Sequence, residues 1–196
     1  MKCTIKKSSL FLFFALIFMP SLLLAHAHAG FTSGFWTGFG HPFGGLDHIL
    51  AMLAVGIWAS QMSERAVWAV PLTFVGVMLI AGGFGMAGIA IPFVEQGILI
   101  SILILGLLIA LAARFPLGAS AVIVGLFAIF HGHAHGEEIP AAITGISYAV
   151  GFGFATVILH GMGIGFGLLF KHIERVPVVR YAGMAITVLG VYLLIP

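Results

Sequence analysis

Six long apolar runs fill most of the sequence and limit what the chain can fold into. They span residues 45–62, 66–89, 95–113, 117–135, 141–169 and 178–195. A helix of about 20 mostly apolar residues crosses the hydrocarbon core of a bilayer, and each run approaches or exceeds that length. Only 7% of the residues are charged, whereas a soluble domain carries about 25%. We therefore expect an all-α membrane protein in which residues 30–196 form one bundle of six transmembrane helices.

The first 29 residues have the parts of a cleavable signal peptide. Three lysines form a basic start, residues 10–24 form an apolar centre, and small residues follow. We expect cleavage after Ala27 or Ala29. The alternative is an uncleaved first transmembrane helix.

The remaining basic residues predict how the chain crosses the membrane. A cleaved signal peptide leaves the new N-terminus outside, and alternation of the spans then places all five of these residues on the cytoplasmic side. They are Arg65, Arg114, Lys171, Arg175 and Arg180. The expected outer loops, at 90–95 and 136–140, contain none. We expect a multi-pass protein of the inner membrane whose mature N-terminus and C-terminus are both periplasmic.

Histidines and carboxylates gather in two segments at the outer ends of predicted spans. Residues 41–48 contain His41, Asp47 and His48, and residues 131–138 contain three histidines and two glutamates. Such groups are costly to hold in a membrane. Together they are common ligands of borderline divalent metals. The two segments predict a metal capture site at the outer face.

Helical spacing sorts the ligands of the second segment. A helix turns about 100° per residue, so His131, His135 and Glu138 lie within about 60° of one another. His133 and Glu137 fall on the opposite side. This reasoning requires the helix to continue past His131, and the alternative is a histidine-rich loop in water.

Asp47 and two isolated residues, Glu95 and His160, leave alternatives open. Three roles are open for Asp47: it could bind the ion, orient a neighbouring imidazole or cap the start of a helix. Glu95, at the outer start of the third span, assists the capture site or caps a helix. His160 lies past the midpoint of the fifth span, where an ionisable group suggests function. We expect it to be a second stop for the ion, with a hydrogen bond to neighbouring backbone as the alternative.

The two segments resemble the signatures of a known family. The first reads His-Pro-x3-Leu-Asp-His-x-Leu-Ala-Met-Leu-Ala-Val-Gly over 41–56, and the second reads Phe-His-Gly-x-Ala-His-Gly-x-Glu over 130–138. Both are similar to motifs of the HupE/UreJ membrane proteins, and the resemblance extends over essentially the whole chain. It implies a nickel or cobalt permease, with hydrogenase or urease maturation proteins as partners beside the bilayer. It also implies these functional positions: His41, Asp47, His48, His131, His135 and Glu138.

These features together predict inward transport of Ni²⁺ or Co²⁺, with the ion as cargo and no permanent cofactor. The single cysteine lies within residues 1–29, which disfavours Cu(I) and thiolate zinc sites but does not separate Ni²⁺ from Co²⁺ or Zn²⁺. There is no basic patch for nucleic acid and no Gly-x4-Gly-Lys motif for ATP. Because binding needs deprotonated imidazole, uptake should weaken below about pH 6.5.

Two other functional classes stay open. One is a membrane accessory protein that hands nickel to a maturation system without transporting it. The other is a membrane metalloenzyme, although the chain lacks His-Glu-x-x-His and has no serine or cysteine nucleophile beside a histidine. We therefore expect no enzymatic activity.

Overall fold

The computed structural model describes residues 31–139, 144–173 and 175–195, and all regular structure in these ranges is helical. The predicted all-α class is confirmed. The predicted signal peptide lies outside the described residues.

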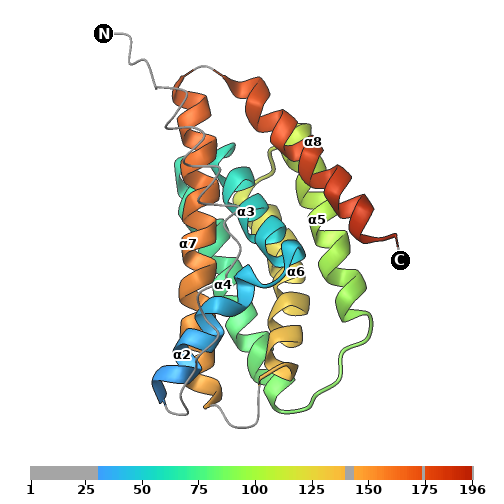
Figure 1. The fold of residues 1–196 in the computed structure, drawn as a ribbon. Coiled ribbons are helices and arrows are strands. Elements are labelled where there is room, and N and C mark those ends of the chain that lie inside the picture. Colours follow the sequence, from blue (N-terminus) through green and yellow to red (C-terminus); the bar gives the residue numbers. More distant parts are fainter. Residues whose placement is uncertain (1–30, 140–143, 174, 196) are drawn as a thin grey trace.

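Seven α-helices and one short 3-10 turn follow one another along the chain (Figure 1). They are α2 (Phe31–Gly40), η1 (His41–Phe43), α3 (Leu46–Ser60), α4 (Glu64–Met86), α5 (Val94–Ala110), α6 (Leu117–Glu137), α7 (Gly145–His172) and α8 (Val176–Leu193). The five helices from α4 to α8 are long and apolar enough to cross a membrane. The segments 34–43 and 46–60 meet at 82° and count as a sixth span if the bent pair is taken as one. The structure therefore has five or six candidate spans.

Helix α3 is the central element of the bundle. Figure 1 shows it between α7 and α5, and α4 also packs against it. All of residues 50–60 of α3 are buried except Leu53, which is half-buried. Gly56 and Gly163 allow α3 and α7 to approach closely, because a methyl group on either would strike the backbone of the other helix. Thus α3 is enclosed by protein rather than by lipid.

Helix α2 was not predicted, and it packs along the beginning of α7. Gly38 lies against the backbone of Tyr148, and Gly151 lies against the backbone of Phe35. The ring of Phe154 lies 6.2 Å from that of Phe39. These close contacts fix the end of α2 and, with it, the position of the next residue, His41.

Three side chains satisfy backbone carbonyls at the end of α5, where a helix leaves its last carbonyls without partners. Trp58 Nε1 donates to Ala113 O at 2.9 Å, and Gln61 Nε2 donates to Ile109 O at 3.1 Å. Arg180 Nε donates to Ala110 O at 2.8 Å. The ends of α3, α5 and α8 are thereby tied together at the side of the bundle away from the histidines.

Candidate metal centre

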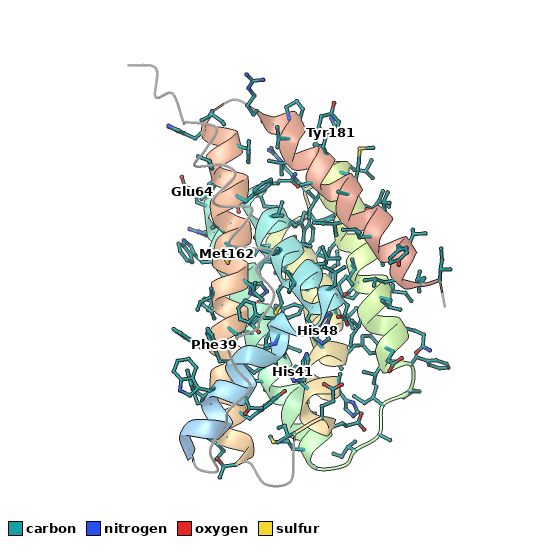
Figure 2. All side chains as sticks on the ribbon, viewed as in Figure 1. Phe39, His41, His48, Glu64, Met162 and Tyr181 are labelled. Carbon is teal, nitrogen blue, oxygen red and sulfur yellow. The ribbon has the colours of Figure 1, made fainter. Side chains whose placement is uncertain are left out.

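The two histidine segments meet where the break between η1 and α3 faces the last turns of α6. Figure 2 shows His41 and His48 on either side of this break. Helix α6 continues to Glu137, so it extends past His131 and the loop alternative is wrong. All six residues expected to bind metal lie in this region, and we call them the histidine cluster: His41, Asp47, His48, His131, His135 and Glu138.

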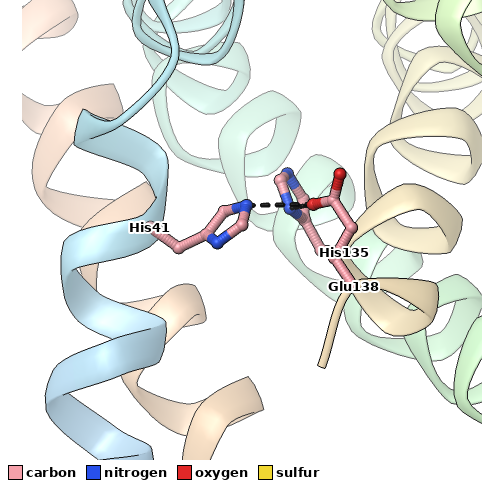
Figure 3. Close-up of side chains that lie close together, drawn as sticks. All are labelled: His41, His135 and Glu138. Carbon is pink, nitrogen blue, oxygen red and sulfur yellow. Dashed lines mark ion pairs between the residues drawn. The ribbon is translucent and has the colours of Figure 1, made fainter. Parts of the chain in front are cut away.

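Three members of the histidine cluster form its exposed mouth (Figure 3). His41 Nε2 lies 3.0 Å from Glu138 Oε2, and His135 Nδ1 lies 3.4 Å from the same oxygen. One ligand atom from each residue lies within 4.8 Å of the other two. Neighbouring ligands of one ion are about 3.0–3.4 Å apart at bond lengths of about 2.1 Å. Small rotations of these side chains would therefore let all three contact one ion.

Burial changes sharply across this mouth. The Glu138 side chain is 54% exposed and that of His135 only 3%. The carboxylate thus faces water, while the imidazole faces the bundle interior. A cation arriving from solvent would meet a negative charge first, and this offsets part of the cost of losing hydration water.

Asp47 pairs with the imidazole that follows it. Its Oδ1 lies 2.8 Å from His48 Nδ1. The N-cap position of α3 is occupied by Gly45 and not by Asp47, so the capping alternative for Asp47 is wrong. A carboxylate at Nδ1 holds the ring in one orientation and directs Nε2 away from it, as carboxylates do beside metal-binding histidines.

Gly45 makes room for this pair. A methyl group at position 45 would collide with Asp47 Oδ1 and would lie 2.7 Å from His48 Nδ1. The backbone there is extended, with φ −120° and ψ 131°, which any residue adopts. Glycine is therefore required at position 45 for steric reasons, because a side chain there would displace the Asp47–His48 pair.

His131 has a defined tautomer. Its Nδ1 lies 3.0 Å from Phe127 O, and a carbonyl oxygen only accepts, so Nδ1 carries the hydrogen. Nε2 then keeps its lone pair. That atom is fully buried and has no hydrogen-bond partner. A backbone carbonyl at Nδ1 and a free lone pair at Nε2 are the arrangement of a histidine prepared for metal.

The four imidazoles of the histidine cluster form a continuous series. The rings of His41 and His135 are 4.7 Å apart, and those of His135 and His48 are 4.4 Å apart. The ring of His131 follows at 5.9 Å from that of His48. The series leads from the exposed mouth to a fully buried ring.

His133 and Glu137 lie outside this series, as the helical spacing predicts. The His133 ring contacts the carbonyl of Ile89, and its Nδ1 lies 3.4 Å from Glu137 Oε2. The side chain is buried and turned toward the connection between α4 and α5. Its role is explained by packing.

The two remaining candidates have different positions. Glu95 lies in the exposed first turn of α5, where a negative charge suits the helix dipole, and it makes no ion pair with the described part of the histidine cluster. His160 is buried within α7, and within the described part of the chain neither ring nitrogen has a hydrogen-bond partner. The alternative in which His160 bonds neighbouring backbone is therefore wrong in this structure.

Sequence reasoning missed Tyr148, on α7. Its ring centre is 5.8 Å from that of His41, and its buried hydroxyl has no partner. With Phe152 and His135 it lines a pocket of about 20 Å³, enough for one water molecule. A lone tyrosine in an apolar run gives no sequence signal, so only the packing of α2 and η1 against α7 reveals it.

Comparison with known proteins agrees with the motifs. A family model described as HupE / UreJ protein matches residues 14–193. Protein HupE of Rhizobium leguminosarum bv. viciae is 46% identical over 182 residues, which cover 92% of this chain and 94% of that protein. No solved structure matches the chain. The chain therefore belongs to the HupE/UreJ family, a family of membrane proteins associated with nickel and cobalt transport.

Proposed function

We propose that the protein is an inner-membrane permease that carries Ni²⁺ or Co²⁺ inward and captures the ion at the histidine cluster. The continuous series of imidazoles, from the exposed Glu138 to the buried His131, supports this proposal. A site that only stored metal would need one closed set of ligands. A series of partly free ligands suits an ion that moves.

The ligand types of the histidine cluster favour metal ions that bind imidazole nitrogen well. Imidazole nitrogens with carboxylates suit Ni²⁺, Co²⁺ and Zn²⁺, and sulfur ligands are absent from the three residues of the mouth. Hard ions such as Mg²⁺ prefer oxygen ligands and keep their water. The proposed cargo is therefore a borderline transition metal, and Glu95 is a further acidic group near the end of the bundle that receives it.

The orientation is part of the proposal. The signal peptide over residues 1–29 would be removed, and residues 30–196 would form one domain with both ends in the periplasm. The histidine cluster then faces the periplasm. Hydrogenase or urease maturation proteins would receive the imported metal in the cytoplasm.

Uptake of radiolabelled nickel and cobalt into proteoliposomes tests the function. We expect the wild-type protein to carry both ions and His48→Ala to lose about tenfold or more of the rate, because His48 links His135 to His131. His133→Ala is the matched control, since it removes a buried imidazole of α6 that lies outside the series.

Two outcomes would count against transport. Tight binding of nickel without flux by the wild-type protein would favour the accessory role. Equal loss of uptake in His48→Ala and His133→Ala would remove the histidine cluster as the capture site.

A further inference from the structure

His160 is a buried imidazole that no part of the fold explains. It lies near the middle of α7, is 1% exposed, and neither Nδ1 nor Nε2 has a hydrogen-bond partner among the residues that the structure describes. A neutral imidazole has one N–H donor and one lone pair, so both are unsatisfied. Buried polar atoms that are left unpaired destabilise the folded protein. Leucine at this position would avoid that cost.

The surroundings of His160 are apolar but adjoin the histidine cluster. The ring of Phe74, on α4, lies 5.2 Å from the ring of His160 and 5.5 Å from that of His131. Both contacts are edge to face. One aromatic ring therefore separates the innermost imidazole of the histidine cluster from His160.

The backbone holds His160 at a fixed place. Gly56 of α3 packs directly against the carbonyl of His160, and Gly163 packs against α3 one turn later. The residue is thus held by a close backbone contact between α3 and α7. A packing role would use an apolar residue here, whereas a ligand role needs this kind of rigid support.

We propose that His160 is an interior station at which the transported ion exchanges ligands after it leaves His131. The inference rests on the transport function proposed above and extends it by a second site deeper in the bundle. The Nε2 atom of His131 is likewise buried and unpaired among the described residues, and both imidazoles contact Phe74, so the ion passes from one imidazole to the other beside this ring. With one protein nitrogen, the station holds the ion weakly, and water supplies its other ligands.

Uptake kinetics separate this station from the capture site. In His160→Leu we expect the maximal rate of nickel uptake to fall about tenfold, while the half-saturating concentration stays within about twofold of wild type. Capture at the histidine cluster is unaffected, but onward movement is slowed. The melting temperature of the variant in detergent should equal or exceed that of the wild type, because two unpaired nitrogens are removed.

A chemical protection experiment tests occupancy without measuring transport. His160→Cys, in a Cys3→Ser background, places a single thiol at the station, and aminoethyl methanethiosulfonate is the probe. We expect nickel to slow labelling of this thiol several-fold. Leu159→Cys is the matched control, because Leu159 is equally buried at 2% but points about 100° away. Nickel should leave its labelling unchanged.

The outcomes distinguish the two proposals. Wild-type uptake together with unimpaired uptake by His160→Leu, or equal labelling of His160→Cys with and without nickel, would overturn the station and leave the permease intact. Absence of wild-type uptake, with labelling of His160→Cys still protected by nickel, would overturn the permease and retain an interior metal site.

Discussion

Substitution of Gly45 tests whether the Asp47–His48 pair needs the space that a glycine leaves. Gly45→Ala should displace the Asp47–His48 pair, because the added methyl group occupies the space of Asp47 Oδ1. We expect the half-saturating nickel concentration for uptake to rise about tenfold, while the melting temperature changes little. Gly83→Ala is the control, since a methyl group there meets nothing within 4 Å. Equal kinetics in both variants would contradict the steric role of Gly45.

Substitution of Tyr148 tests whether its buried hydroxyl contributes to metal binding. Tyr148→Phe keeps the ring that stacks on Phe152 and removes only the buried hydroxyl. If that hydroxyl hydrogen-bonds water on the ion at the mouth, nickel affinity should fall several-fold without loss of stability. Isothermal titration of the purified protein measures this. Unchanged affinity would leave Tyr148 as a packing residue.

The sequence predicted the residues of the histidine cluster better than their partners. Helical spacing alone separated His131 and His135 from His133, because periodicity reports which residues share a face. Spacing does not report which atom a neighbouring helix places beside a ring. For that reason the sequence left three roles open for Asp47 and gave no indication of Tyr148.

At the scale of elements, the contact between α4 and α6 holds the histidine cluster in place. Gly132 and Gly136 of α6 lie directly against the backbone of Met78 and Gly82 on α4. Gly132→Ala should push α6 outward and destabilise the protein by about 1–3 kcal/mol. Gly161→Ala in α7 meets open space and should have little effect. Thermal unfolding in detergent compares the two, and similar melting temperatures would contradict the importance of this contact.

Long apolar helices were predictable as elements, and interrupted ones were not. The runs that became α4 to α8 carry a continuous hydrophobic signal that depends only on composition. Helix α2 has ten residues, six of them threonine, serine or glycine and four aromatic, and its stability comes from packing on α7. Such features depend on neighbours that are distant in the sequence.

At the scale of the whole molecule, the distribution of basic residues predicts the orientation. Gln96 is exposed at the end of the bundle that carries the histidine cluster, and His172 is exposed at the far end of α7. In a Cys3→Ser background, a membrane-impermeant maleimide added to cells with a permeable outer membrane should label Gln96→Cys. It should label His172→Cys only after the inner membrane is broken. The reverse pattern would place the histidine cluster in the cytoplasm.

The spacing of the imidazoles has a kinetic consequence. Neighbouring ring centres in the histidine cluster are 4.4–5.9 Å apart, so in the proposed transport a bound ion would reach the next nitrogen before it had to release the last. Dehydration of a divalent ion is then divided into several small barriers rather than one large one, and the rate depends exponentially on the highest of them. An ion that exchanges ligands slowly would stall at every step. Selectivity in such a path is therefore set by the rate of ligand exchange as well as by affinity.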